Sequence, residues 1–156
     1  MFLLSERKER VKRKKTVVMA LDVYLQKDAS FPETSENRFL EFEDDGYYWF
    51  LYSFFKDLSK QTDQVIDRCE DAFFNGKDLE LFNQMIDHVR NEIAEKPDIW
   101  EEFIGTIIHQ NIRGKGKAEK QYSTVHKTEL QWILAKLEKA VAKAKKQNLG
   151  IFFFGD

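Results

Sequence analysis

The residue types that most often carry catalysis or bind metal ions are few in this chain. They are three histidines, His88, His109 and His126, and one cysteine, Cys69. No two histidines stand three or four positions apart, the spacing that would place two metal ligands on one helical face. A lone cysteine cannot form an internal disulfide or a cysteine zinc site, and its position on the apolar side of an expected helix predicts a buried, inert thiol. We therefore expect no catalytic residue, no metal site and no cofactor. An enzyme site built from residues far apart in the sequence remains an alternative.

A glycine- and lysine-containing segment, Gly114-Lys115-Gly116-Lys117, has some likeness to a phosphate-binding loop. The Walker pattern requires an earlier glycine and a Ser or Thr after the lysine, at a turn from strand to helix. Here Ala118 follows Lys117. The segment is more typical of a solvated hairpin loop, which we expect over residues 113–120.

Carboxylates form the most informative pattern. If residues 63–74 are helical, Asp63, Asp67, Glu70 and Asp71 share one side of that helix. Repulsion between aspartates four residues apart costs roughly 0.2–0.5 kcal/mol per pair, so this side is either a solvated face or a surface for a cationic partner. A second acidic group could extend the surface next to aromatic residues. It comprises Glu41, Glu43, Asp44, Asp45 and the neighbouring Tyr48.

Charge is distributed unevenly along the chain. The formal net charge of the 156 residues is -2, but residues 28–102 hold 20 acids and 7 bases, whereas residues 103–156 hold 4 acids and 10 bases. The bases that could bind nucleic acid are Arg113, Lys115, Lys117, Lys120 and the lysines near the C-terminus. A phosphate-binding module is therefore an alternative function, although the acidic middle disfavours it.

Residues 1–18 have a composition unlike the rest of the chain. They hold seven bases and two acids with little apolar periodicity, and an alternating segment begins after Met19. We expect residues 1–18 to be a basic extension, and Met19 to be a possible natural start. The folded domain is then 19–156. The 42% apolar content of the whole chain is typical of a globular protein, the chain has no apolar run of membrane-spanning length, and its single cysteine suits the cytoplasm.

Periodicity predicts the elements of this domain. Alternation predicts strands at 21–26 and 39–43, and apolar stripes at helical spacing predict helices at 47–58, 63–74 and 78–96. Residues 98–110 fit either a helix or a strand; Gly105 and the β-branched residues after it favour a strand at 102–109. A return strand at 121–125, a helix after a Thr128–Gln131 capping box and a buried strand at 151–154 complete the order. The fold class is α+β, in the order β-β-α-α-α-β-β-α-β, with an antiparallel or mixed sheet covered by helices.

The order of these segments resembles a known type of protein. A strand, then FLEFEDDGYYWFLY, WEEFIGT, YSTVHKTEL and a terminal LGIFFFGD resemble small bacterial immunity proteins encoded beside polymorphic or contact-dependent toxins. The resemblance implies a cytoplasmic, non-catalytic protein that binds a cognate toxin, for example a nuclease with a cationic cleft. It supplies no binding residues. The nine residues of the two acidic groups above come from charge reasoning alone.

Overall fold

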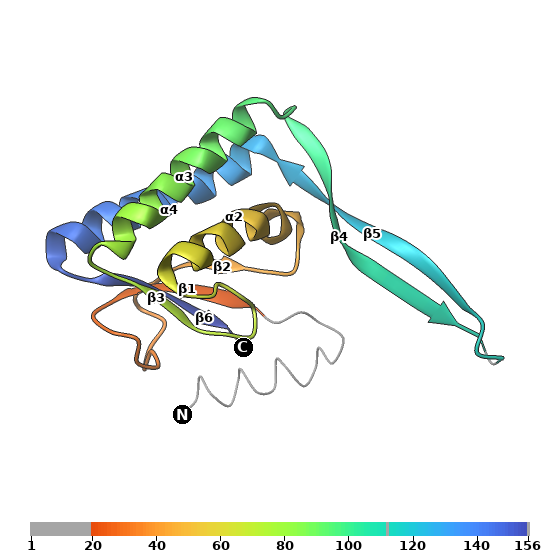
Figure 1. Ribbon diagram of the computed structural model, residues 1–156, viewed down its shortest axis with the longest axis horizontal. Coiled ribbons are helices and arrows are strands. Elements are labelled where there is room, and N and C mark those ends of the chain that lie inside the picture. The colour runs from red at the N-terminus through yellow and green to blue at the C-terminus, as the bar shows by residue number, and fades with distance from the viewer. Residues whose placement is uncertain (1–19, 112, 156) are drawn as a thin grey trace.

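The computed structural model describes residues 20–111 and 113–155. The basic extension and Met19 lie outside the described residues. The described elements are β1 (Leu21–Gln26), β2 (Arg38–Phe42), α2 (Gly46–Thr62), β3 (Ala72–Phe74), α3 (Asp78–Ala94), β4 (Ile99–Gln110), β5 (Gly116–His126), α4 (Lys127–Gln147) and β6 (Gly150–Gly155). The fold class α+β is confirmed (Figure 1).

A four-stranded antiparallel sheet with the order β2-β1-β6-β3 forms one layer. The predicted C-terminal strand is confirmed, and β6 pairs with β1 on one side and with β3 on the other. A central position suits this strand because Ile151, Phe152 and Phe153 are all nearly inaccessible to solvent. The sheet is antiparallel rather than mixed.

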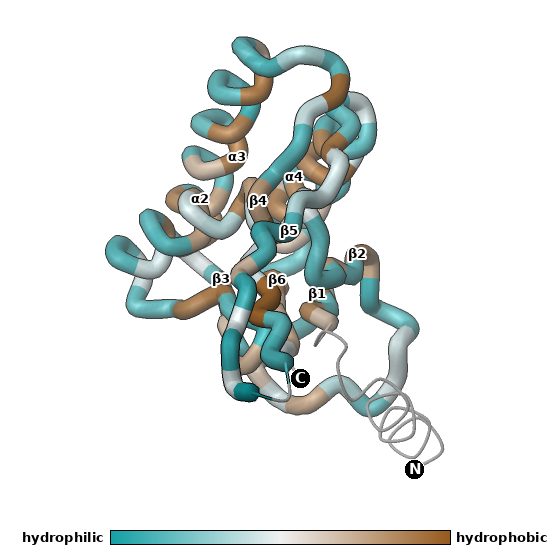
Figure 2. Tube along the Cα trace, turned by 90° about the vertical axis from the view of Figure 1, so that its right-hand side faces the viewer, coloured by the Kyte–Doolittle hydropathy of each residue, from teal (hydrophilic) through white to brown (hydrophobic). Residues whose placement is uncertain are grey.

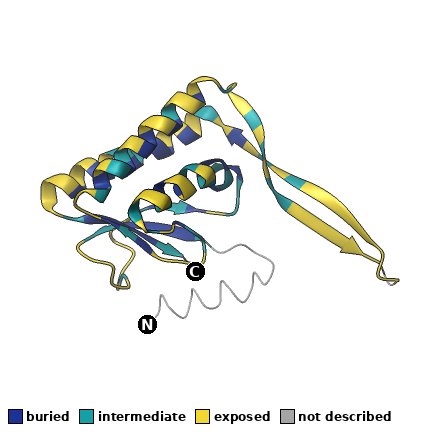
Figure 3. Ribbon diagram, in the orientation of Figure 1, coloured by how far each residue is buried: buried dark blue, intermediate teal, exposed yellow. Residues whose placement is uncertain are grey.

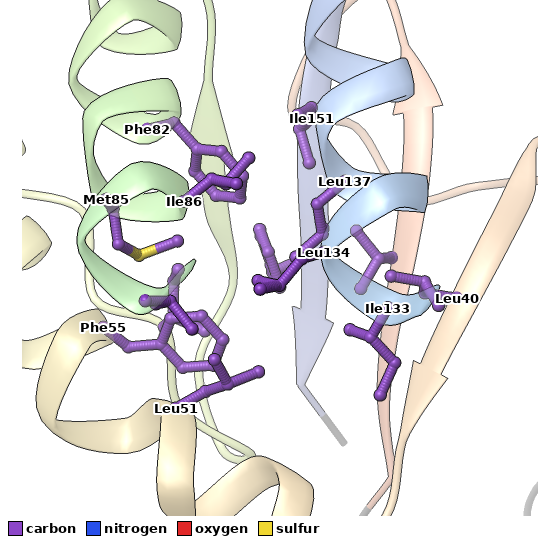
Figure 4. Close-up of a cluster of buried hydrophobic side chains, with 14 of the residues drawn as sticks. Leu40, Leu51, Phe55, Phe82, Met85, Ile86, Ile133, Leu134, Leu137 and Ile151 are labelled. Carbon is purple, nitrogen blue, oxygen red and sulfur yellow. The ribbon is translucent and has the colours of Figure 1, made fainter. Parts of the chain in front are cut away.

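Three helices, α2, α3 and α4, pack over one face of the sheet (Figure 1). Their apolar stripes meet in a continuous core, in which Phe55 and Met85 lie on one side and Leu134 and Leu137 on the other (Figure 4). Phe153 is one of the residues that the sheet contributes to this core, and its ring lies 5.9–6.0 Å from the rings of Phe55, Phe74 and Phe82. Packing in this core holds the strands in place. It thereby positions the charged segments that lie at the ends of the sheet.

The strand prediction for residues 102–109 is confirmed and extended. β4 and β5 form a separate two-stranded antiparallel hairpin that projects from the body (Figure 1). A bulge between Phe103 and Gly105, where Gly105 has φ +148°, interrupts the pairing, and this accounts for a glycine within a strand. The expected mobile loop over 113–120 is wrong in extent, because β5 already begins at Gly116.

The expected helix over residues 63–74 is wrong. α2 continues to Thr62 and ends at Asp63, which adopts the left-handed conformation (φ +60°). The hydroxyl of Thr62 accepts a hydrogen bond from the Gln64 amide, but it lies at the end of one helix rather than at the start of another. The chain then runs without helix to β3, which occupies Ala72–Phe74. The observed order is therefore β-β-α-β-α-β-β-α-β.

Helix starts were predicted with mixed success. The sequence offers either Asp44 or Asp45 as the cap of the helix expected at 47–58, and the structure shows Asp45, whose carboxylate accepts hydrogen bonds from the amides of Tyr47 and Tyr48 at 3.0 and 3.2 Å. The Thr128–Gln131 capping box is wrong: α4 starts at Lys127, and the residue before it, His126, makes no side-chain cap. In the described part of the chain, no helix combines the length and apolarity needed to cross a bilayer.

Candidate functional site at the acidic end of the sheet

Two acidic segments far apart in the sequence meet at one end of the four-stranded sheet. The first follows β2 and the second precedes β3, and Leu21, Phe42 and Gly155 are cross-strand neighbours at this end. Four adjacent strands span about 14 Å, so the two segments lie within that distance. We call this surface the acidic end and define it by Glu43, Asp44, Asp45, Asp67, Glu70 and Asp71.

Arg68 holds the two segments together. Its Nη1 lies 3.1 Å from Asp44 Oδ2, and its guanidinium carbon lies 5.2 Å from the ring centroid of Trp49 and 5.6 Å from that of Tyr48. The indole Nε1 of Trp49 donates to the other oxygen of Asp44. An arginine between a carboxylate and two aromatic rings combines ion pairing with cation–π contact. The segment after α2 is thereby fastened to the start of α2.

Asp45 has a structural role at this end. Burial raises the pKa of its carboxyl, and the charges of Glu43 and Asp44 add to that increase in pKa, while the two amide hydrogen bonds oppose it. The carboxylate is thus committed to the α2 N-terminus, where a negative charge is favourable. Asp45 was predicted to bind a partner, but helix capping explains its position better.

Tyr48 does not fit the role of an interface anchor. Only 1% of its surface is exposed. Burial, with the charge of Asp67 as a smaller cause, raises the pKa of its hydroxyl to about 12. It belongs to the core, and Trp49 packs against it with ring centroids 5.2 Å apart. The expectation that Tyr48 contacts a partner is therefore corrected.

The remaining predicted carboxylates fall into three groups. Glu43, Glu70 and Asp71 are exposed at the acidic end, although Asp71 also accepts a hydrogen bond from the Gly155 amide at 3.1 Å. Asp67 is partly buried and accepts from the Cys69 amide in a local turn. Glu41 lies on β2 beside Arg38, with 3.9 Å between the charged atoms. Three carboxylates are therefore available to a partner.

Asp63 lies apart from this group. It ends α2, whereas Asp45 begins it, and a 17-residue helix is about 25 Å long. The structure therefore separates Asp63 from the carboxylates with which a helical stripe would have grouped it. The other predicted carboxylates come together because the chain runs back along α2 after that helix ends. No periodicity in the sequence predicts this return.

The candidate catalytic residues are dispersed. His88, His109 and His126 are all exposed and lie on α3, on β4 and at the end of β5. Cys69 is exposed too, which contradicts the expected core thiol. Within residues 20–111 and 113–155, no group of three or more His, Cys, Asp or Glu side chains could hold a metal ion. A small hollow between α2 and α3 contains Asp57 and His88 in its lining.

Four of the bases that were predicted to bind nucleic acid are grouped on the hairpin, whereas the lysines near the C-terminus lie on α4. Arg113 and Lys115 lie in the turn, and Lys117 and Lys120 lie on β5. The side chain of Asn111 organises the turn by accepting from the amides of both Arg113 and Lys115 at 3.0 Å. The turn joins two strands and leads into no helix, so the phosphate-loop geometry is absent from this segment.

Exposed apolar residues on the hairpin were missed as a surface feature. Phe103, Ile107, Ile108 and Tyr122 are 46–66% exposed, and Figure 3 shows most of the hairpin as solvent-accessible. On α3, by contrast, apolar and polar residues alternate along the turns of the helix (Figure 2), and most of its apolar residues are buried in the core. The apolar residues were visible in the sequence, but their strand pattern gave no sign that the hairpin would stand away from the core.

Comparisons with known proteins give this chain no relative. No protein-family model matches it, and searches of the curated proteins and of the solved structures found no match.

Proposed function

We propose that this protein is a non-catalytic binding protein that neutralises a cognate bacterial toxin by covering a cationic surface with its acidic end. The observation that carries the proposal is the gathering of Glu43, Glu70 and Asp71, all exposed, from two segments that are distant in the sequence. A cytoplasmic location belongs to the same proposal. It rests on the sequence resemblance and on the single cysteine.

Electrostatics explains how such a surface acts. Exposed carboxylates attract a basic partner over about 10 Å at moderate ionic strength, which raises the rate of association. Asp44, Asp45 and Asp67 are partly buried and engaged in structural contacts, so they add to the local potential while Glu43, Glu70 and Asp71 make the contacts. The positive charge of Arg68, paired with Asp44, makes the net charge of this surface less negative by one.

Co-expression with the protein encoded beside this gene is the direct test. We expect growth rescue and a complex that co-purifies at low salt. The triple variant Glu43→Lys, Glu70→Lys, Asp71→Lys should abolish both rescue and co-purification, because it reverses the exposed charges and leaves Asp44, Asp45 and Arg68 in place.

A matched control has the same change of charge on α3 and at its C-cap. It carries Asp87→Lys, Glu92→Lys and Glu95→Lys, all at exposed positions distant in sequence from the acidic end. This control should keep rescue and binding. Equal loss in both variants would show that overall charge matters rather than this surface, and the absence of a toxic neighbour would remove the proposal.

A further inference from the structure

The outer edge of β4 differs sharply from the outer edge of β5. From Phe103 to Gln110, β4 has no charged side chain when His109 is neutral, and it includes the β-branched run Thr106-Ile107-Ile108. β5 contains Lys117, Glu119 and Lys120 over the paired stretch. Charged residues, lysine in particular, protect an exposed edge strand from pairing with another strand. β5 has that protection, whereas β4 does not.

The distal part of β4 is also open to solvent. Ile107 is 46% exposed and Ile108 66% exposed, and β5 is the strand with which β4 is paired in the described chain. An isolated two-stranded ribbon is marginally stable in water, and a third strand or a packed surface stabilises it. This ribbon therefore has an unpaired, apolar edge at which a further strand could be added.

We propose that β4 pairs antiparallel with β4 of a second copy of this chain, so that the two hairpins form one four-stranded sheet. A two-fold axis near the centre of residues 106–110 generates this arrangement, because antiparallel pairing of identical strands is self-complementary. Pairing through β5 is disfavoured, because it would oppose the lysines of the two copies.

Charge complementarity favours a second copy as the occupant. Glu101 and Glu102 lie at the base of the hairpin, whereas Arg113 and Lys115 lie in the turn at its tip. Antiparallel pairing places the tip of each hairpin beside the base of the other. The two-fold axis therefore forms two equivalent clusters of opposite charge at the ends of an uncharged, β-branched centre.

Sedimentation equilibrium and light scattering of the full-length chain test this inference. The expected species is a dimer of the 18.5 kDa chain. Ile108→Lys should raise the dimer dissociation constant at least about tenfold, because it places like charges at the two-fold axis. The matched control is Ala118→Lys, which adds the same charge to the residue directly opposite Ile108 on β5 and should leave dimerisation unchanged.

A charge exchange tests the geometry. Glu101→Arg and Arg113→Glu should each weaken the dimer, and the double variant should restore it. Far-UV circular dichroism and thermal unfolding of each variant establish that the monomer fold is retained. A monomer at all concentrations, equal effects of Ile108→Lys and Ala118→Lys, or no restoration in the double variant would overturn the proposal. A monomer that binds a DNA duplex with a steep salt dependence would instead support nucleic-acid binding by the bases at the tip of the hairpin.

Discussion

Replacing Arg68 with alanine tests how the acidic end is held together. The guanidinium contacts the Asp44 carboxylate and lies over the rings of Tyr48 and Trp49, and the side chains of Arg68 and Asp44 are each 24% exposed. The substitution removes the cation while leaving both rings and the carboxylate in place. We expect it to lower the free energy of unfolding and to loosen residues 63–71 from the start of α2.

The magnitude follows from the contacts that are lost. An ion pair of this exposure contributes about 0.2–1 kcal/mol, and each cation–π contact about 0.5–1 kcal/mol. Apolar contact of the arginine stem with the rings adds to this sum, whereas the side-chain entropy regained in the unfolded state offsets part of it. The expected net loss for Arg68→Ala is about 1.5–2.5 kcal/mol.

Equilibrium urea unfolding measures this loss. A double-mutant cycle with Asp44→Asn should give a coupling energy of about 0.5–1 kcal/mol, since the two side chains are in contact. Arg90→Ala is the matched control: Arg90 pairs with Glu138 on the surface, where such a pair contributes at most about 1 kcal/mol. A loss below about 0.5 kcal/mol for Arg68→Ala, or strict additivity with Asp44→Asn, would refute the role assigned to Arg68.

Three further predictions concern Asp45, Tyr48 and Gly150. Asp45→Ala should cost about 1 kcal/mol through the lost helix cap, whereas Asp45→Asn should keep the cap. The pKa of Asp45 is raised in the folded state, so its contribution to stability is full below the unfolded pKa of 3.8 and declines as pH rises. Asp45→Asn should therefore gain stability relative to the natural chain between pH 3 and 7, as measured by urea titrations. For Tyr48, the pKa rises from 10.0 to about 12 on folding, so alkaline pH should destabilise the natural chain more than Tyr48→Phe as pH rises through that interval, measured by thermal unfolding. Gly150→Ala should cost about 1–3 kcal/mol, since its Cβ would lie 2.4 Å from a Phe73 ring carbon and 2.7 Å from the Phe74 carbonyl oxygen. Gly116→Ala is the control and should be tolerated, because the nearest contact of its Cβ is an exposed Ile108 methyl at 3.1 Å. Equal melting temperatures for the two variants would contradict this explanation.

Most of the fold could be predicted because most of its elements have strong local signals. α3 has six buried apolar residues at helical spacing, and β1 alternates cleanly. The failure at residues 63–74 has a long-range cause. Val65, Ile66 and Cys69 have helical spacing, but only Ile66 is buried, and Ala72–Phe74 pair with β6, a strand some 80 residues later. Long-range pairing outweighed a helical pattern that already placed like charges four residues apart.

The candidate site could be predicted in composition but not in arrangement. Charge alone identified both acidic segments, and the structure joins them through Arg68, a residue that the acidic pattern gave no reason to select. Sequence could not reveal that Asp67 accepts a hydrogen bond from a backbone amide, or that Tyr48 is buried. These roles depend on where the chain returns after α2.

Comparison of the uncharged runs of the sequence strengthens the reason to expect a covered hairpin edge. One third of the residues are charged, yet three runs of nine or more residues carry no charge at pH 7 with histidine neutral: 46–55, 103–112 and 147–155. The first contributes the buried face of α2, and the third contains the central strand β6. Most of the side chains in these two runs are buried or partly buried, which accounts for their lack of charge. The second includes Ile107 and Ile108, which are exposed on β4, although a single charged residue there would be tolerated sterically. An exposed, uncharged edge strand is prone to aggregation, so its presence is best explained if another strand covers it in the functional protein. Antiparallel pairing with a second copy of this chain supplies that strand without a partner of different sequence.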